Sequence, residues 1–392
     1  MLIGLVGKPN AGKSTFFKAA TLIDVLIANY PFATIKANRG IAYVKIKDLA
    51  AEFGKVSNPR EGYVRQGWRF VPFELIDVAG LVQGASEGKG LGNEFLNDLS
   101  AADAFIHVVD MSGEFDGEGK PTENYLSERD IEIIENELDK WYLGILKKVW
   151  ESFSRSLEMQ KKKFEESVAK QFSGLKVTQE DVRYAVQKCG LNVDKPSNWS
   201  ISDLGMFAQM LRKNTKKMII AANKIDRPRG EENFEMIKNK FNYPIIPCFA
   251  DGELALREAD KTDIINYIPG EKIFEIKKDL NDKQENALGG IKKIIEKFNS
   301  TGIQDVLNKV VFDILKYVAV YPAGSTKLTD SKGNVLPDCF LMPPGSTALD
   351  FAFRLHTDIG KNFVKAIDVR TKKAVGKDYV IKNGDGLEIM TK

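Results

Sequence analysis

The stretch that decides the fold is Gly7-Lys8-Pro9-Asn10-Ala11-Gly12-Lys13-Ser14, close to the amino terminus. It fits G-x-x-x-x-G-K-[ST], the pattern of the phosphate-binding P-loop. Residues 2–6 before it are apolar and predict a buried strand, and residues 15–20 after it predict a helix. Glycines let backbone N–H groups surround phosphate oxygens, and the helix N-terminus adds the positive end of its dipole. The stretch therefore predicts a nucleotide site, with a glycine-rich strand-to-helix turn as the alternative.

The motif also predicts individual roles. We expect Lys13 to reach the β- and γ-phosphates, and we expect the Ser14 hydroxyl to bind Mg²⁺. The predicted nucleotide-binding residues of this region are Lys8, Pro9, Asn10, Ala11, Gly12, Lys13, Ser14 and Thr15.

Two further segments are predicted to complete the phosphate end of the site. Thr34 follows the P-loop lysine by about twenty residues, where a switch loop would close over Mg²⁺ and the γ-phosphate; an ordinary loop threonine is the alternative. Residues 73–80 form an apolar strand that ends in the pattern D-x-x-G. In that pattern Asp77 would hold Mg²⁺ through water, and the Gly80 N–H would meet the γ-phosphate. The predicted catalytic residues are Lys13, Thr34 and Gly80, and the predicted metal-binding residues are Ser14, Thr34 and Asp77.

Leu81 stands where Ras-like proteins place the glutamine that orients the attacking water. Because a leucine side chain forms no hydrogen bonds, either hydrolysis is slow or another group orients this water. One hypothesis is a K⁺ ion that Asn10 helps to hold against the phosphates; a loop asparagine that caps a turn is the alternative. Residues 82–95 contain four glycines and predict a second nucleotide-sensing switch. The apolar residues 103–110 predict another buried strand, in which we expect His107 to be a satisfied core histidine.

The pattern changes between residues 111 and 216. Apolar residues recur at every third or fourth position from residue 131 to residue 172, which predicts an amphipathic helix of about 60 Å if it is unbroken. Shorter helices are predicted after a cap at Thr178 and after a serine cap at Ser202. We interpret this segment as a helical, coiled-coil-like arm inserted into the nucleotide domain. Its charged surface predicts either partner binding or simple solvation.

The α/β pattern resumes with a strand that ends in N-K-x-D, formed by Asn223, Lys224 and Asp226. An aspartate carboxylate accepts two hydrogen bonds from guanine N1–H and N2–H₂, and adenine offers no such pair of donors. The asparagine is expected to tie this loop to the P-loop. The next strand, 244–250, ends in Phe249-Ala250 where a serine–alanine pair usually stands. We therefore expect only the Ala250 N–H to meet guanine O6.

The C-terminal residues 317–392 show short strands and turns, typical of a small α+β domain. We expect His356 there either to form a hydrogen bond at a helix end or to contact RNA. The predicted fold class is α/β: a P-loop domain whose mostly parallel sheet is flanked by helices, with a helical insertion and a C-terminal α+β domain. The predicted boundaries are 1–110 and 217–316 for the nucleotide domain, 111–216 for the insertion, and 317–392 for the last domain.

The amino-acid composition limits the classes of protein to which this chain can belong. The 392 residues carry a net charge of +3, so no global basic field indicates nucleic acid. Three widely separated cysteines and two histidines predict neither disulfides nor a structural metal site. No apolar run approaches the ~20 residues of a membrane span, and a strand that begins at residue 2 leaves no room for a signal peptide. We expect a cytoplasmic monomer without a membrane partner.

The motifs GKPNAGKS, NYPFATIKAN and DVAGLVQGASEGKGLGNEFL, with a helical insertion before NKID, resemble the Obg-like translation-associated GTPases. Within them the chain is most similar to the YchF subgroup in its archaeal form, and residues 349–360 resemble the helix and loop of a TGS domain, a β-grasp module. The resemblance implies ribosome association, with contacts to ribosomal RNA or tRNA through the arm and the TGS domain. Family members carry a hydrophobic residue in place of the glutamine, as Leu81 does, and K⁺-stimulated relatives carry an asparagine at the position of Asn10.

Many YchF relatives have N-x-x-E in place of N-K-x-D and prefer ATP, whereas Asp226 favours guanine. We therefore predict a Mg²⁺-dependent enzyme that slowly hydrolyses GTP to GDP and phosphate and acts as a switch on the ribosome, with K⁺ assistance as a further hypothesis. Two alternatives stay open: an ATP-preferring ATPase of the YchF type, and a ribosome- or RNA-binding scaffold whose nucleotide site is nearly inert.

Overall fold

The computed structural model describes residues 1–21, 39–77, 84, 99–324, 326–330 and 332–392. Thr34, Gly80 and Leu81 lie outside these residues, as does the predicted second switch except Gly84. The described chain forms two compact units. Residues 1–19, 39 and the described part of 74–306 belong to the first unit, and the remaining described residues belong to the second.

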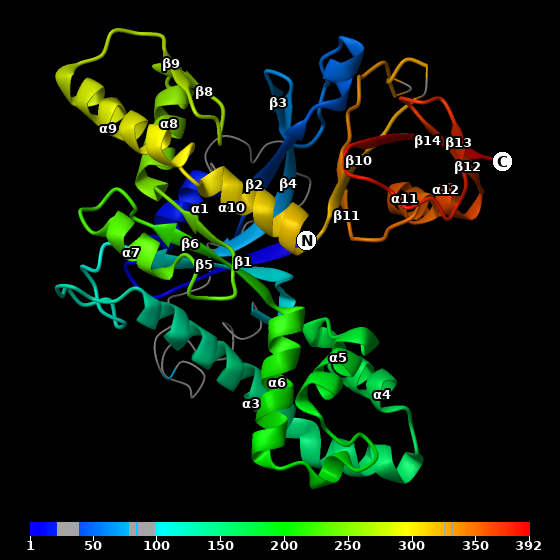
Figure 1. Ribbon diagram of the computed structural model, residues 1–392. Coiled ribbons are helices and arrows are strands. Elements are labelled where there is room, and N and C mark those ends of the chain that lie inside the picture. The colour runs from blue at the N-terminus through cyan, green and yellow to red at the C-terminus, as the bar shows by residue number, and fades with distance from the viewer. Residues whose placement is uncertain (22–38, 78–83, 85–98, 325, 331) are drawn as a thin grey trace. The chain divides into compact units, whose positions relative to one another are not determined.

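A parallel sheet in the order β4-β1-β5-β6-β7 forms the centre of the first unit (Figure 1). Strand β1 is buried along its whole length, as expected for a strand covered on both faces. It pairs with residues 74–77 of β4 on one side and with β5 on the other. Because all these strands are parallel, their carboxyl ends meet at one edge, where ligands of such sheets bind. The strands are β1 Leu2–Val6, β4 Trp68–Asp77, β5 Ala104–Asp110, β6 Lys217–Asn223 and β7 Ile245–Pro247.

Helices accompany this sheet and a small hairpin. Two apolar clusters hold them in place, one between β5, β6 and α7 and the other between α8, α9 and the hairpin β8–β9. The elements are α1 Lys13–Thr21, α7 Gly230–Ile237, α8 Ala250–Lys261, β8 Ile265–Tyr267, β9 Phe274–Ile276, α9 Asp282–Phe298 and α10 Ile303–Asn308.

The inserted segment is helical, as the apolar spacing predicts. The long helix α3 ends where Lys161 adopts a left-handed conformation with φ of 49°, so the predicted single helix is two helices and α3 alone measures about 50 Å. Capping boxes at Thr178 and Ser200 begin α5 and α6; the cap predicted at Ser202 is therefore two residues too late. The elements are α3 Glu128–Gln160, α4 Phe164–Gln171, η4 Ser173–Leu175, α5 Gln179–Cys189, η5 Pro196–Asn198 and α6 Ile201–Thr215. We call α3 to α6 the helical arm; Figure 1 shows its helices side by side.

Aromatic side chains hold the arm together. Trp150 of α3 stacks on Trp199 with 5.1 Å between the ring centroids, and Phe164 and Phe207 pack against the same pair. Aromatic rings bury a large apolar area, so these four side chains contribute substantially to the apolar core of the arm.

The second unit combines two segments that are far apart in sequence, 40–73 and 307–392. Its C-terminal part is a five-stranded sheet in the order β11-β10-β14-β12-β13 with two helices, which matches the predicted α+β domain. His356 caps α12 by accepting a hydrogen bond from the Asp358 N–H at 3.1 Å, the structural role that we expected. The elements are β2 Arg39–Lys47, η2 Leu49–Phe53, β3 Tyr63–Arg65, the π-helix Lys309–Ile314, β10 Val318–Pro322, β11 Phe340–Met342, α11 Ala348–Leu355, α12 Thr357–Lys361, β12 Phe363–Asp368, β13 Ala374–Val375 and β14 Asp385–Thr391.

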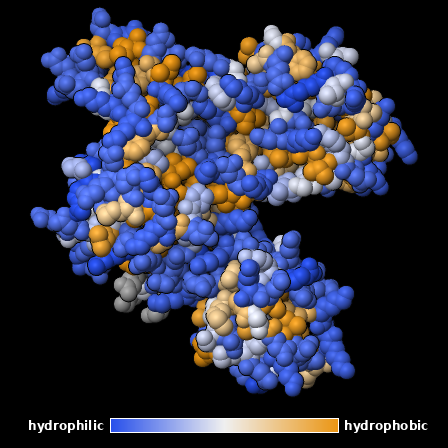
Figure 2. Space-filling view, viewed as in Figure 1, coloured by the Kyte–Doolittle hydropathy of each residue, from blue (hydrophilic) through white to orange (hydrophobic). Residues whose placement is uncertain are grey.

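In the described part of the chain, no helix is long and apolar enough to cross a membrane. The face of the molecule in Figure 2 is mostly hydrophilic, with apolar residues in small groups.

Candidate functional site

The P-loop lies between β1 and α1, and two of its glycines are required by close packing. At Gly7, φ is 151° and an added Cβ would lie 2.5 Å from the carbonyl oxygen of Val108. At Gly12, φ is 91° and a Cβ would lie 2.2 Å from Nδ2 of Asn223. No L-side chain fits either position without a shift of the backbone or of the N-K-x-D loop, residues 223–226, which we call the base motif.

The phosphate end of the site brings together three predicted residues: Lys13, Ser14 and Asp77. The Lys13 Nζ donates to the Lys8 carbonyl at 2.9 Å, and the Ser14 hydroxyl donates to Asp77 Oδ2 at 3.1 Å. Burial lowers the pKa of Lys13, although the charge of Asp77 opposes this shift. Burial likewise raises the pKa of Asp77, against the effect of Lys13 and of the Ser14 hydrogen bond.

The donor set at this end fits Mg²⁺. Asp77 Oδ1 is buried and has no hydrogen-bond partner among the described residues, while its other oxygen meets the Ser14 hydroxyl. A hydroxyl and a carboxylate oxygen are hard donors, which Mg²⁺ prefers together with phosphate oxygens and water. Among the described residues, no group of three or more His, Cys, Asp or Glu side chains is placed to hold a metal ion.

The base motif is tied to the P-loop as predicted. Asn223 donates from Nδ2 to the Ala11 carbonyl at 3.0 Å and accepts the Ala250 N–H on Oδ1 at 3.1 Å. The Ala250 N–H, which we expected to meet guanine O6, is thus engaged by Asn223 in this structure. Lys224 forms an ion pair with Asp110 at 2.8 Å and lies 4.6 Å from the centroid of the Phe115 ring.

Asp226, the last residue of the N-K-x-D motif, is half-buried. Its carboxylate is 3.8 Å from the Arg227 Nε, and burial raises its pKa. A carboxylate that is partly removed from water gains more from paired N–H donors than a fully solvated one does.

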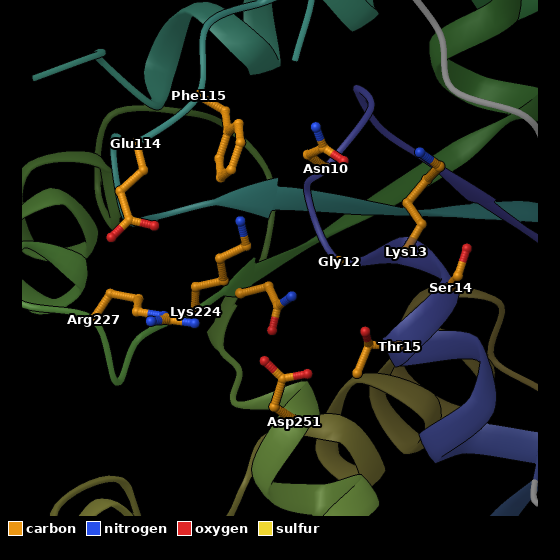
Figure 3. Close-up of a pocket in the computed structure, with 11 residues that line it drawn as sticks. Asn10, Gly12, Lys13, Ser14, Thr15, Glu114, Phe115, Lys224, Arg227 and Asp251 are labelled. Atoms are coloured by element: carbon orange, nitrogen blue, oxygen red, sulfur yellow. The ribbon is translucent and has the colours of Figure 1, made fainter. Parts of the chain in front are cut away.

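The phosphate and base ends open into one cavity of about 470 Å³ (Figure 3). Four residues that the sequence reasoning did not select also line it: Glu114, Phe115, Arg227 and Asp251. Glu114 and Phe115 follow the predicted strand 103–110, so their place after a parallel strand was the available signal. The lining residues are Asn10, Gly12, Lys13, Ser14, Thr15, Glu114, Phe115, Asn223, Lys224, Arg227 and Asp251.

Some of the predicted residues that the structure describes do not line this cavity: Lys8, Pro9, Ala11, Asp77, Asp226 and Ala250. Lys8 is buried and pairs with Asp130 at 2.9 Å, and burial raises the pKa of that carboxyl to about 6. Asn10 lines the cavity, but its Nδ2 donates to the Gly119 carbonyl at 2.9 Å. His107 is fully buried, as predicted for a core residue, yet neither ring nitrogen has a hydrogen-bond partner among the described residues.

A P-loop at the edge of a parallel sheet, joined to an N-K-x-D loop, defines the class of P-loop GTP-binding proteins. Comparison with known proteins narrows this class. Family models match the 50S ribosome-binding GTPases over residues 2–148, the G4 motif-containing domain of YGR210-like Obg-like GTPases over 221–324, and the TGS domain over 322–391.

The chain is 45% identical to an uncharacterized GTP-binding protein of Methanocaldococcus jannaschii over 100% of this chain and 99% of that protein. The crystal structure of a GTP-binding protein from Pyrococcus horikoshii covers both chains completely with 40% identity and a TM-score of 0.79. The ribosome-binding ATPase YchF of Bacillus subtilis is 27% identical over 97% of this chain and 96% of its own length. The protein belongs to the Obg-like, YchF-related family of GTP-binding proteins with a C-terminal TGS domain.

Proposed function

We propose that this protein hydrolyses GTP to GDP and phosphate in a Mg²⁺-dependent reaction and works as a slow molecular switch. The observation that supports this most is the single cavity that Lys13 and Ser14 line at one end and Asn223 and Lys224 at the other. That arrangement fits a nucleotide lying across the carboxyl edge of the sheet, with phosphates on the P-loop and the base at N-K-x-D.

The proposed chemistry is in-line attack of water on the γ-phosphate. Mg²⁺ would be held by Ser14, by Thr34 of the first switch and, through water, by Asp77. When bound, the ion would neutralise charge on the β- and γ-phosphate oxygens. Lys13 and the P-loop N–H groups stabilise the charge that develops, and the Gly80 N–H is proposed to meet the γ-phosphate. Since Leu81 has no hydrogen-bonding group with which to orient the water, we expect the intrinsic rate to be low.

Preference for GTP rests on Asp226, because the rest of the base end suits either purine. Phe115 and the Lys224 side chain offer flat contacts that do not distinguish guanine from adenine. ATP is the competing nucleotide, since the Bacillus subtilis relative is named an ATPase.

Competition of GTP and ATP for the Mg²⁺-loaded protein tests this assignment. We expect GTP to bind at least about tenfold more tightly, roughly 1.4 kcal/mol, and Asp226→Ala to remove that margin. Glu235→Ala is the matched control, since this exposed carboxylate of α7 does not line the cavity and should leave the preference intact. Equal or tighter binding of ATP by the wild type would identify an ATPase of the YchF kind.

We also propose that the protein acts on the ribosome, as a monomer in the cytoplasm. Two descriptions support this: one family model is named for 50S ribosome binding, and one relative is named a ribosome-binding ATPase. The competing proposal is a scaffold with a nearly inert nucleotide site. GTP turnover measured with and without 50S subunits separates them: strong stimulation supports the switch, and negligible turnover under both conditions supports the scaffold.

K⁺ assistance by Asn10 is the last part of the proposal. The hydrogen bond to Gly119 uses the side-chain nitrogen of Asn10, whereas a cation is held by oxygen atoms. Turnover in KCl should exceed turnover in NaCl at equal ionic strength, and Asn10→Ala should lose the difference. Identical rates in the two salts would remove K⁺ from the mechanism.

A further inference from the structure

The P-loop contains a second lysine, Lys8, that does not line the nucleotide cavity. Its side chain is 3% exposed, and a buried ammonium is costly unless it is paired and hydrogen-bonded. The partner is Asp130, whose side chain is 1% exposed and whose Oδ2 lies 2.9 Å from the Lys8 Nζ. Removing either charge would leave the other buried without its counter-ion.

Asp130 lies in the first turn of α3, the helix that begins the helical arm. The start of this helix is fixed to the sheet, because the Ser127 hydroxyl donates to the Asp110 carbonyl at 2.7 Å. Asp110 in turn pairs with Lys224 of the base motif. The N-terminal turn of α3 is therefore linked to the P-loop and to the base motif by buried polar contacts.

The loop that precedes α3 covers the P-loop. Lys8 Nζ donates to the Phe115 carbonyl at 2.6 Å and lies 4.3 Å from the centroid of the Tyr125 ring. Gly119 has φ of 79°, and a Cβ there would lie 2.8 Å from Cβ of Pro9. Phe115 itself lines the nucleotide cavity, so the Lys8 ammonium contacts a cavity-lining residue and the arm at once.

The backbone of Lys8 adds a connection to the phosphate end. Its carbonyl accepts a hydrogen bond from the Lys13 Nζ at 2.9 Å. An ammonium group carries three donors, so Lys13 can hold this carbonyl and phosphate oxygens at the same time. Bound phosphate would then restrain Lys13, Lys8 and, through the ion pair, the first turn of α3.

A second contact joins α3 to the segment that is predicted to be the second switch. Glu137, which is buried and lies farther along α3, accepts the backbone N–H of Gly84 at 3.0 Å. Gly84 belongs to the segment predicted as the second switch. The helix thus meets two parts of the site whose positions should depend on the nucleotide.

We propose that the Lys8–Asp130 ion pair couples occupancy of the nucleotide cavity to the conformational stability of the helical arm, with Asp130 as a positioning residue. This inference rests on the proposed nucleotide binding and adds to it the route by which the arm senses the nucleotide. Coupling of this kind is reciprocal. If the nucleotide changes the affinity of the arm for a partner by some factor, the bound partner changes the affinity for the nucleotide by the same factor.

Hydrogen–deuterium exchange of the full-length protein, with and without a saturating non-hydrolysable GTP analogue and Mg²⁺, tests the coupling. In the wild type the analogue should slow exchange in the P-loop peptide and, by about fivefold or more, in residues 128–140. Asp130→Asn should keep the slowing in the P-loop and lose it in residues 128–140. A purely structural role would instead speed exchange equally with and without the analogue.

Glu132→Gln is the matched control, because this residue lies in the same part of α3 but is exposed, and it should behave as the wild type does. If Asp130→Asn does not fold, the double variant Lys8→Met/Asp130→Leu avoids an unpaired buried charge and should also lose the slowing in residues 128–140. The coupling is wrong if these variants retain that slowing, or if the wild type shows it only in the P-loop. No slowing in the wild-type P-loop would instead contradict nucleotide binding itself.

Discussion

At the scale of single residues, Asp77 shows how much one carboxylate contributes to the proposed metal site. Its two oxygens divide their roles, one meeting Ser14 and the other buried without a described partner. Asp77→Asn should weaken the Mg²⁺ dependence of GTP affinity, because a neutral amide attracts the hydrated ion less than a carboxylate does. GTP titrations with Mg²⁺ and with EDTA measure this. Glu74→Gln on the same strand is the control and should keep the full Mg²⁺ effect; an undiminished effect in Asp77→Asn would exclude Asp77 from holding Mg²⁺.

His107 provides a pH-dependent contribution to stability. Burial lowers its pKa from 6.5 to about 3, so between these values the unfolded chain binds a proton that the folded chain does not. Stability therefore falls as the pH falls through this window, by about 2 kcal/mol at pH 5 relative to neutral pH. In urea unfolding at pH 7 and pH 5, His107→Leu should lose this part of the difference.

The other histidine supplies the control for that measurement. His356 is exposed, and His356→Asn keeps a capping side chain at the start of α12, so the pH effect should stay as in the wild type. An unchanged difference in His107→Leu would assign the acid sensitivity to other groups.

At the scale of elements, a helix with regular apolar spacing was predictable from the sequence, whereas helix ends and loops without such spacing were not. The apolar spacing predicts α3 well, because one buried stripe forms its core contacts. Its end at Lys161 carries no signature, since a lysine there adopts the left-handed conformation that glycine usually provides, as Gly190 does after α5. The place of Phe115 in the cavity was not predicted, because this residue lies in a loop without periodicity. Its position is set by contacts with Lys8 and Lys224.

The junction between α3 and α4 carries a basic surface that suits the proposed ribosomal partner. Lys162, Lys163 and Lys170 line a depression of about 610 Å³ together with a single acidic residue, Glu166. Replacing these three lysines by glutamine should weaken binding to 50S subunits and reduce its salt dependence, because each phosphate contact releases counter-ions. Ribosome co-sedimentation at two salt concentrations measures the effect.

A matched triple variant tests whether position or only net charge matters. Lys272→Gln, Lys277→Gln and Lys278→Gln remove the same charge around the β8–β9 hairpin and should leave ribosome binding close to that of the wild type. Equal losses in both variants would indicate non-specific attraction, and no loss in the arm variant would place the contact elsewhere.

At the scale of the whole molecule, the sequence predicts the order of its parts but not how they associate. Local motifs place the P-loop, the base motif and the C-terminal α+β region, because each motif depends on residues close together in the chain. The second unit instead joins residues 40–73 with 307–392, and no local pattern encodes such distant contacts. The predicted start of the C-terminal domain at residue 317 stays a prediction. Within the second unit, residues before 317 contact many residues after it.

Arg69 is a buried residue that links these two segments. It is 1% exposed and donates to the carbonyls of Leu336 and Pro337, each at 3.1 Å, and to the carbonyl of Glu61 at 3.4 Å. Arg69→Met should destabilise the protein by about 3 kcal/mol, because it leaves several buried carbonyls without a donor. Thermal unfolding and limited proteolysis of residues 40–73 measure the loss. Arg60→Met is the control: Arg60 pairs with two carboxylates but is half-exposed, so its loss should change stability little. Equal effects of the two substitutions would mean that exposed ion pairs, and not the buried arginine, hold these segments together.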